Sequence, residues 1–506
     1  GRAPPRGTRD RARPAPTAAA AGRAASGHHG SVLHPDRLLP ADPGVRRLAR
    51  ALYERTRDLP IVSPHGHLDP AAFADDAPVD DIAHELVSRD HYVLRMLHSQ
   101  GVPLEALGRR PLGDDAPPTP GREVWHTFAE HWHRFRATPT RQWIEHTLGE
   151  VLGIDVPLGP DTADDVYDAA NERLADPAYR PRALYERFGL EFLATTDAAL
   201  DPLEAHARLR DDRWPGRVVP TFRPDDVVDP DRPDFAANLD RLADLTGEDT
   251  GSWDGYLAAL RARRAAFADL GATATDHGPA TPTTVDAPPA EAAALFARVR
   301  GGGSDGRTDG ERRADAACFR GVMLTELAAM SAEDGLVMQI HPGSWRNHDP
   351  AVHRRFGPDA GADIPRRVDF VGGLAPLLGR LGHEPRLTVV LYTLDESTYS
   401  RELAPLAGHY PVLRLGPAWW FHDSPEGMRR FRRLVTETAG FHNTVGFNDD
   451  ARSLLTIPAR HDVARRIDAG FLAELVAEHR LDEAEAAETA ADLAVGLARR
   501  AFRVDP

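Results

Sequence analysis

The sequence predicts an α/β fold of the (β/α)8 barrel class, in which eight parallel strands are each followed by a helix. Two observations lead to this class. Short apolar runs that end in polar residues recur along the chain, and the stretches between them carry apolar residues at helical spacing. Near-continuous apolar strands separated by helices are typical of parallel sheets, because crossover helices cover both faces.

The first predicted strand lies in "LPIVSPHGHLDP", residues 59–70, and ends at His65 and His67. Side chains at positions i and i+2 of a strand point to the same face of the sheet. Both imidazoles can therefore reach one point, as a metal site requires. Paired histidines also end strands without binding a metal, so this pair alone leaves both interpretations open.

Seven further segments show the same apolar run with a polar end. They are "LEFLATTD" (190–197), "RVVPTFRPD" (217–225), "GATATDHG" (271–278), "GLVMQIHPGSWRN" (335–347), "RLTVVLYTLDE" (386–396), "YPVLRLGPAWWF" (410–421) and "NTVGFNDDARS" (443–453). Helical spacing separates them, for example in residues 234–247 and 425–440. Eight such units complete the predicted barrel.

The remaining segments do not fit this repeat. Residues 71–189 have helical spacing and are expected to form a helical insertion after the first strand. A shorter insertion is expected at roughly 280–330, with a flexible stretch at 300–313. Residues 1–30 are basic and have almost no large apolar side chains, so we expect a disordered extension before a barrel domain at 31–506. The acidic, alanine-rich end is expected to form terminal helices.

Composition excludes several classes of function. The chain has 61 basic and 77 acidic residues and a net charge of -16, which argues against nucleic-acid and membrane-surface partners. Its single cysteine, Cys318, excludes an intramolecular disulfide and a Cys-rich metal site, and favours a cytoplasmic location. It contains no lysine, which excludes Schiff-base chemistry and a Walker loop. No run approaches 18 apolar residues, so no membrane span is expected.

The active site of such a barrel lies at the carboxyl ends of the strands. His341 ends the fifth predicted strand and Asp450 the eighth, and both add to His65 and His67. Imidazole and carboxylate are the ligands expected for zinc or manganese, and a mononuclear site keeps a position open for substrate.

Several motifs occur together, in order and at strand positions: "PHGHLDP", "DHYVLRMLHSQGV", "ATTD", "TFRPD", "ATDHG", "MQIHPGSWRN", "AWWFHD" and "GFNDDARSLLTIPARHDVARR". In these motifs the chain resembles uronate isomerases, a divergent branch of the amidohydrolase superfamily, over about residues 33–505. The resemblance implies a barrel of the metal-dependent hydrolase type. It also implies conversion of D-glucuronate to D-fructuronate and of D-galacturonate to D-tagaturonate.

The resemblance further implies His65, His67 and Asp450 as ligands of one divalent metal ion, zinc or alternatively manganese. His341 lies close by, and Tyr92 and Arg452 complete the catalytic group. Two departures stand out. Asp449 competes with Asp450, which we align because it lies two residues before Arg452, as "D-x-R" requires. Pro342 directly follows His341.

Aldose-to-ketose isomerisation moves a proton from C2 to C1 and another between the two oxygens. It needs a base, an acid and a group that stabilises the enediolate. Asp450 can act as the base at carbon, Tyr92 can move protons at oxygen, and Arg452 can oppose the negative charge. The metal is expected to orient the substrate's carboxylate and adjacent hydroxyl more than to activate a water molecule.

Other polar and aromatic residues at strand ends are expected to bind the substrate. They are Arg223, Arg346, Asn347, Trp419, Trp420, Asp276 and His277. Each has a structural alternative: the arginines could form ion pairs, the Asp–His pair could be a hydrogen-bonded core pair, and the tryptophans could pack at the rim. A strand exposes its neighbours to opposite sides, so only one tryptophan is expected to face the pocket. Tyr92 could equally be a packing residue.

Two other functions compete with the isomerase. A metal-dependent hydrolase, such as a deaminase or lactonase, usually presents a further histidine at the end of strand six, and "LYTLDE" offers none. A non-catalytic sugar-acid binding protein should have lost the polar strand ends. We expect a small hexuronate as substrate and a homo-oligomer. The preferred uronate and the metal stay open.

Overall fold

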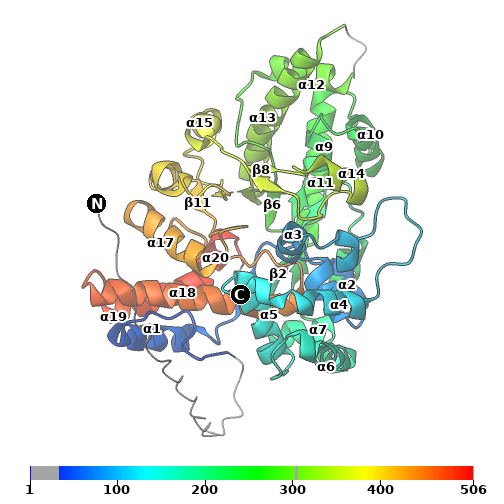
Figure 1. The fold of residues 1–506 in the computed structure, drawn as a ribbon. Coiled ribbons are helices and arrows are strands. Elements are labelled where there is room, and N and C mark those ends of the chain that lie inside the picture. Colours follow the sequence, from blue (N-terminus) through cyan, green and yellow to red (C-terminus); the bar gives the residue numbers. More distant parts are fainter. Residues whose placement is uncertain (2–32, 302–305, 505–506) are drawn as a thin grey trace, which may run out of the picture.

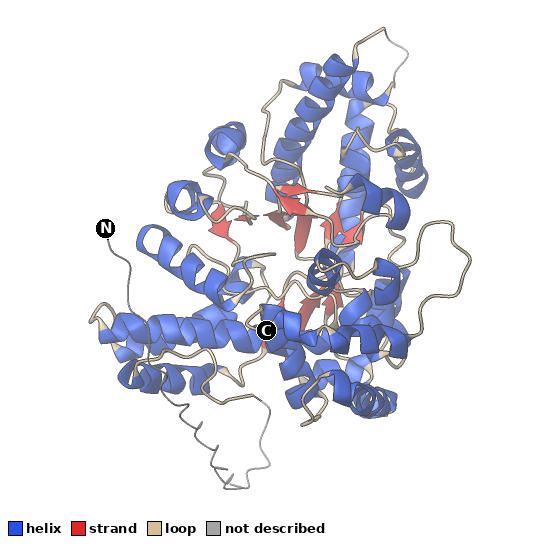
Figure 2. Cartoon of the chain, in the orientation of Figure 1, coloured by secondary structure: helices blue, strands red, loops and turns tan. Residues whose placement is uncertain are grey.

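The computed structural model describes residue 1 and residues 33–301 and 306–504 of the chain. The predicted disordered extension therefore lies outside the described residues, apart from Gly1. Strands occupy the middle of the view in Figure 2, with helices on every side of them. Within the described ranges, no helix combines the length and apolar composition needed to cross a membrane.

The strands are short and most are buried. They are β1 (Ile61–Ser63), β2 (Leu190–Ala194), β3 (Asp197–Ala198), β4 (Val218–Val219), β5 (Phe222–Arg223), β6 (Ala274–His277), β7 (Val337–Ile340), β8 (Ser344–Trp345), β9 (Ile364–Pro365), β10 (Val389–Leu391) and β11 (Leu413–Leu415).

Two parallel sheets contain all of these strands except β8 and β9, which pair with each other antiparallel. The sheet orders are β1-β2-β4 and β11-β10-β7-β6-β5-β3. Two residues separate β2 from β3, and two separate β4 from β5. The hydrogen-bond ladder continues across these gaps, because the Thr195 N–H donates to the Val219 carbonyl at 3.0 Å and the Asp197 N–H to the Thr221 carbonyl at 3.0 Å. The predicted α/β class with parallel strands is confirmed.

The eighth predicted strand is reduced to one bridge, between Leu415 and Thr444. The chain leaves the sheet directly afterwards, because Gly446 has a φ of 78°. A Cβ at this position would lie 2.7 Å from the Leu493 carbonyl oxygen, so the close approach requires glycine. The buried strand expected at the start of 443–453 is therefore present only as this bridge, and the rest of the segment forms a loop.

The 335–347 run was expected to be one buried strand followed by a loop. It is divided into β7 and β8, and β8 pairs Trp345 with Ile364 of β9. Gly343, with a φ of 92°, lies between the two strands. We call this antiparallel pair, whose strands are connected by residues 346–363, the hairpin; Arg346 and Asn347 begin the connection.

The segment between β1 and β2 is fully described and forms helices only. These are α2 (Pro70–Asp75), η1 (His84–Ser88), α3 (His91–Ser99), η2 (Leu104–Leu107), α4 (Gly121–Glu130), η3 (Trp132–Phe135), α5 (Pro139–His146), η4 (Thr147–Val151), η5 (Pro160–Thr162), α6 (Ala163–Ala175), η6 (Pro177–Tyr179) and α7 (Pro181–Arg187). Their apolar side chains form one cluster with strand residues Ile61, Leu190 and Val218. The insertion therefore packs on the sheet instead of forming a separate body.

Helices also connect the later strands. These are α8 (Glu204–Asp211), α9 (Asp225–Val228), α10 (Phe235–Thr246), α11 (Trp253–Asp269), α12 (Pro289–Arg300), α13 (Asp309–Asp334), α14 (Pro350–Phe356), α15 (Phe370–Leu381), η7 (Tyr399–Leu403), α16 (Ala404–Ala407) and α17 (Pro425–Ala439). Because Thr308 and Glu311 form a capping box, α13 begins inside the stretch 300–313 that was expected to be flexible.

Helices from the first and last parts of the sequence pack together. They are α1 (Pro43–Thr56), η8 (Leu454–Thr456), α18 (Ile457–Ala477), α19 (Glu483–Ala491), η9 (Asp492–Gly496) and α20 (Leu497–Ala501). Figure 1 shows α1 beside α18 and α19. Leu52 and Tyr53 of α1 pack in one cluster with Leu472 of α18. The start of α18 follows directly after the polar end of the eighth segment, so this helix can brace it.

Candidate active site

A cavity of about 690 Å³ contains most of the residues that the sequence predicted for the site. Its lining includes His67, Tyr92, Arg223, His277, Arg346, Asn347, Trp419, Trp420, Asp450 and Arg452. The other three predicted residues, His65, Asp276 and His341, are buried and at most 4% exposed. The predicted residues therefore come together from strands and loops far apart in the sequence.

His65 and His67 both approach one oxygen of Asp450. The Nε2 atoms of His65 and His67 lie 3.5 Å and 3.1 Å from Asp450 Oδ1. Neither histidine belongs to β1, which ends at Ser63, so the alternation of a strand is not what aligns them. Backbone contacts fix the loop instead: the His67 N–H donates to the Ala451 carbonyl at 2.9 Å.

These three residues fit a divalent metal ion. One ligand atom from each lies within 4.8 Å of the other two. Asp450 Oδ1, which faces the two histidines, is buried and has no hydrogen-bond partner in the described part of the chain. Two imidazole nitrogens and a carboxylate oxygen are a donor set suited to zinc and manganese. A cation would satisfy atoms that burial otherwise leaves at a cost.

The backbone around Asp450 turns its carboxylate toward the histidines. Asp450 has a φ of 49°, uncommon for a residue with a side chain. Its other oxygen, Oδ2, accepts a hydrogen bond from Trp419 Nε1 at 2.9 Å. Burial alone would raise the pKa of Asp450, but the nearby His67, His65 and His341 lower it well below the usual range. The carboxylate is therefore ionised.

Asp449, the competing candidate, points elsewhere. Its Oδ2 lies 3.0 Å from His461 Nε2, and its Oδ1 accepts a hydrogen bond from the Ala451 N–H at 3.2 Å. Asp449 thus stabilises the turn that presents Asp450. The geometry favours Asp450 as the member of the cluster.

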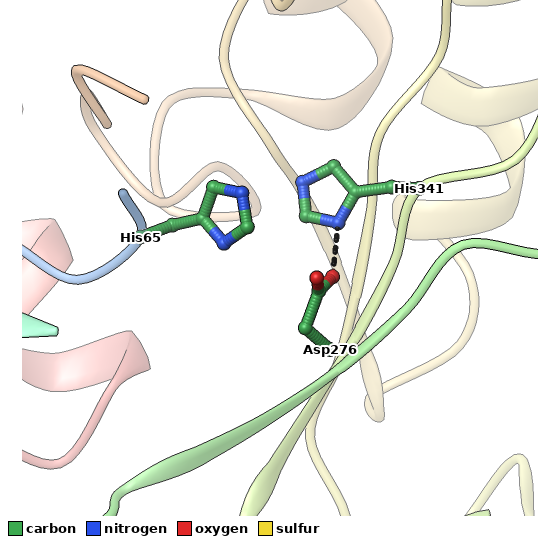
Figure 3. A group of neighbouring side chains, drawn as sticks. All are labelled: His65, Asp276 and His341. Atoms are coloured by element: carbon green, nitrogen blue, oxygen red, sulfur yellow. Dashed lines mark hydrogen bonds and ion pairs between the residues drawn. The ribbon is translucent and has the colours of Figure 1, made fainter. Parts of the chain in front are cut away.

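A second buried group lies beside the first. In Figure 3 the rings of His65 and His341 lie side by side, and Asp276 lies next to His341. The ring centroids of His65 and His341 are 4.4 Å apart, and His341 Nδ1 is 2.6 Å from Asp276 Oδ1. This contact favours a proton on Nδ1 and leaves Nε2, which has no partner within the described residues, as a lone-pair donor. Burial lowers the pKa of His341 to about 4, so the ring is neutral near pH 7.

Arg223 is engaged by two carboxylates. Its Nε lies 2.7 Å from Asp225 Oδ2, and its terminal nitrogen lies 3.0 Å from Asp276 Oδ2. Burial alone would raise the pKa of Asp276, but Arg223 and His341 lower it well below the usual range. Of the two alternatives for Arg223, this geometry is the ion pair. His277, next to Asp276, turns to Thr275 Oγ1 at 2.9 Å, so the two neighbours do not pair with each other.

The opposite side of the cavity is more open. Arg346 donates to Asp363 Oδ2 at 2.8 Å, and Asp363 Oδ1 accepts from the Asn347 N–H at 2.7 Å. Arg452 lies 3.9 Å from Asp359 Oδ1, and the same oxygen is 3.7 Å from His91 Nε2. The Arg346 and Arg452 side chains are 42% and 37% exposed. These cations can approach an anion in the cavity.

The positions of Trp419 and Trp420 differ from the expectation. Both line the cavity, although only one was expected to face it. The reason is that β11 ends at Leu415, so Trp419 and Trp420 lie in a turn and do not alternate as strand neighbours do. Trp420 lies under the Arg346 guanidinium, 5.5 Å from its ring centre.

Tyr92 lies in the first turn of α3, where the side chain of Asp90 caps the helix by accepting from the Tyr92 and Val93 N–H groups. The Tyr92 hydroxyl donates to Asp423 Oδ1 at 2.5 Å and accepts from the Phe421 N–H at 2.8 Å. Burial first, and then Asp423, raise the pKa of Tyr92 well above its usual range. Tyr92 is therefore a protonated phenol with a fixed orientation.

Sequence reasoning missed Asp423, Arg460, His91 and Asp359, which also line the cavity. Asp423 stands in "AWWFHD" and Arg460 in "IPARHD", so both lie within recognised motifs. His91 directly precedes Tyr92 in "DHY". Only Asp359 lies outside these motifs.

Comparison with known proteins shows which family the chain resembles. A model of the family described as "Glucuronate isomerase" matches residues 45–501. A protein named "Uronate isomerase" from Rhizorhabdus wittichii is 62% identical over 472 residues, covering 93% of this chain and 98% of its own. One of the same name from Rhizobium meliloti is 58% identical over 473 residues, covering 94% and 99%.

Solved structures agree. The crystal structure of glucuronate isomerase from Caulobacter crescentus matches with a TM-score of 0.90 and 52% identity, covering 94% of this chain and 97% of that one. The crystal structure of a uronate isomerase from Thermotoga maritima matches with a TM-score of 0.85 and 26% identity, covering 94% and 100%.

Proposed function

The chain belongs to the glucuronate isomerase family, and from that premise we propose how its cavity isomerises a hexuronate. It is a uronate isomerase, an aldose–ketose isomerase that interconverts D-glucuronate and D-fructuronate, and D-galacturonate and D-tagaturonate. The proton transfer runs through an enediol. The relatives named uronate isomerase support this activity over the hydrolase and the non-catalytic binding protein.

At carbon, Asp450 removes the proton from C2 and returns it to C1. The proposal is supported by the position of Asp450 in the cavity lining, beside His67 and Trp419. One oxygen of Asp450 faces the histidines, while Oδ2, with Trp419 as its donor, has a further lone pair for the proton.

At oxygen, Tyr92 moves the second proton, and Arg452 opposes the charge of the enediolate. The hydroxyl of Tyr92 is within the cavity and protonated, which supports a role as proton carrier. Within the described chain, Arg452 forms one ion pair, a long one of 3.9 Å with Asp359, so its guanidinium can bind a further anion. Arg346 and Asn347 are the proposed neighbours of the substrate's own carboxylate.

His65, His67 and Asp450 would hold one divalent ion, zinc or alternatively manganese. When bound, the ion would polarise substrate oxygens and orient the carboxylate and its adjacent hydroxyl. His341 and Asp276 brace the same region from behind, since the His341 ring stacks on His65.

We also propose that the eight β segments close into one (β/α)8 barrel, with the helical insertion as part of a single domain over 31–506. Closure between the first and eighth segments is supported by the hydrogen bond from the His67 N–H to the Ala451 carbonyl. Assembly into a homo-oligomer and a cytoplasmic location stay predictions from the sequence.

The observation that carries the proposal is the cluster of His65, His67 and Asp450 beside a protonated tyrosine in one cavity. The test is an isomerisation assay of the metal-supplemented chain with D-glucuronate and D-galacturonate carrying deuterium at C2. We expect ketose formation with a primary isotope effect. Because Asp450 returns the proton it removed, label can stay in the product, and any exchange with solvent speaks against a hydride shift. Full retention of the label together with unchanged turnover in a metal-loaded Asp450→Asn variant would favour a hydride shift and remove Asp450 from its role as base.

A further inference from the structure

Two hydrogen bonds fix the donor and acceptor roles of the Tyr92 hydroxyl. It donates its hydrogen to Asp423 Oδ1 and accepts one hydrogen bond from the Phe421 N–H. A phenol has one hydrogen to donate, and its oxygen can accept more than one hydrogen bond. Toward the cavity, Tyr92 is therefore an acceptor while Asp423 is ionised, and it becomes a donor only when Asp423 holds a proton.

Asp423 is suited to hold that proton for a time. It is only 8% exposed and lies at the cavity wall, next to the N-cap of α17. Burial first raises the pKa of Asp423, although Arg460 and the Tyr92 hydroxyl partly oppose this. A carboxylate with a raised pKa accepts a proton more readily than an exposed one.

Arg460 fixes the geometry of this group. Its terminal nitrogen lies 3.0 Å from Asp423 Oδ2 and 3.2 Å from the Asp449 carbonyl oxygen. The guanidinium also stacks on Trp143, 3.9 Å from the ring centre. One side chain thus links the partner of Tyr92 to the turn that presents Asp450.

We propose that Asp423 is the second station of a proton relay at the substrate oxygens, acting through Tyr92 and held in place by Arg460. The inference rests on the proposed isomerase function and adds a residue to it. Asp423 is a positioning and relay residue, because Tyr92 stands between it and the sugar acid.

The relay balances over the reaction. Asp450 takes the C2 proton, the C–H electron pair becomes the C1–C2 double bond, and the C1 carbonyl pair moves to O1. The O2 proton passes to Tyr92 as the Tyr92 proton passes to Asp423, and both moves reverse to protonate O1. The O2 lone pair then forms the C2 carbonyl, and C1 takes the proton from Asp450. No electrons leave the substrate.

A structural ion pair elsewhere provides the matched control. Arg432 and Asp468 form a buried pair between α17 and α18, at 2.6 Å and 2.9 Å, with no tyrosine hydroxyl in the pair. If Asp423 served stability alone, Asp423→Asn and Asp468→Asn should behave alike. The relay instead predicts a loss of turnover at position 423 only.

The experiment is a double-mutant cycle of Asp423→Asn and Tyr92→Phe in the full, metal-supplemented chain, with kcat and KM for D-glucuronate corrected for folded fraction and metal content. We expect each single change to lower kcat about 100-fold or more, with KM within about threefold. The double variant should be no more than about threefold worse than either, since a shared step is lost only once. Asp468→Asn should lower the melting temperature and keep kcat within about twofold.

Multiplicative losses in the double variant, or an unchanged kcat in Asp423→Asn, would overturn the relay alone. If Asp423→Asn does not fold, the same cycle with Asp423→Glu decides, because glutamate keeps the charge beside Arg460 but shifts the carboxylate. In that cycle the relay predicts a loss of kcat with Tyr92 present and little further loss in the Tyr92→Phe background. Absence of isomerisation by the unsubstituted chain overturns the proposed function and the relay together.

Discussion

Two regions of the cavity are built in different ways. The floor, defined as His65, His67, Asp276, His341 and Asp450, has side chains that are at most 25% exposed and contacts of 2.6 to 3.5 Å. The rim, defined as Arg346, Asn347, Asp359 and Arg452, has half-exposed side chains, and the contact between its Arg452 and Asp359 is 3.9 Å long. Groups that must react are fixed in place, whereas the cations that must receive a ligand are left partly unsatisfied.

The backbone carries the same contrast. The floor histidines and Asp276 follow or belong to β1, β6 and β7. The rim residues lie on loops, where Asn347 and Asp359 have φ values of 53° and 60°; among the floor residues Asp450 alone, with a φ of 49°, has a comparable backbone, and the turn around it is fixed by Asp449. Loops of this kind can adjust to a ligand, while strand ends hold reacting groups rigidly. The predictions below test this division, and the floor should be the more sensitive part.

The largest effect should come from the floor. Replacing both His65 and His67 with alanine should abolish bound metal and lower kcat/KM more than about a thousandfold, because two of three proposed ligands are lost. Metal analysis and the isomerisation assay measure both. The control is the double change His383→Ala with His409→Ala, a surface pair with ring centres 6.4 Å apart, which should keep metal and activity. A full metal equivalent in the His65 and His67 variant would show that the ligand set is wrong.

A comparable effect should appear when the substrate, and not the enzyme, loses its charge. D-Glucose and D-galactose should be turned over at least about a thousandfold more slowly in kcat/KM than the matching uronates, since the rim cations would lack their carboxylate. Competition and direct assays on the unsubstituted chain measure this. Comparable efficiency on glucose and glucuronate would remove the proposed role of the rim.

Arg452→Met should lower kcat for D-glucuronate by about 100-fold, because a cation that opposes the enediolate charge would be missing. The protein should stay folded, since the side chain is 37% exposed and its ion pair is long. Steady-state kinetics measure the loss of turnover, and thermal unfolding shows whether the variant stays folded. A rise in KM alone would mean that Arg452 binds the ground state and does not assist the reaction.

The smallest effect should follow from Arg346→Met. This side chain already pairs with Asp363 and is 42% exposed, so we expect a loss of about tenfold in kcat/KM for uronates, mainly through KM. The weak activity on glucose should be nearly unchanged. An equal loss on both sugars would show that Arg346 supports the hairpin and not the carboxylate.

Most of the fold was accessible from the sequence because the strands are apolar and buried. The runs at 190–197, 271–278 and 386–396 each contain a strand of the parallel sheets, as expected. The β8–β9 hairpin was not expected from the sequence. It pairs Trp345 with Ile364, and both of these side chains are exposed. The hydrophobic pattern carries no signal for such a pair.

The site was predicted by residue type but not by pairing. Its members could be chosen because strand ends and motifs mark them. The partner of each carboxylate could not be predicted. Asp423 is 331 residues from Tyr92, and Asp363 contacts Arg346 only because the hairpin brings the two together. From the sequence, Asp450 was preferred to Asp449 only for its spacing to Arg452, and nothing in the sequence indicated that Asp449 contacts His461 of α18. Such choices depend on long-range packing.

The position of α18 has a consequence for how the protein is made. This helix carries Arg460 and His461, and it follows Asp450 directly. Asp450 leaves the ribosome 383 residues after His67. At about 5 to 20 residues per second, this takes roughly 20 to 80 s of synthesis. During that time the two histidines lack Asp450, so a nascent chain cannot assemble the proposed ligand set until residue 450 has been made.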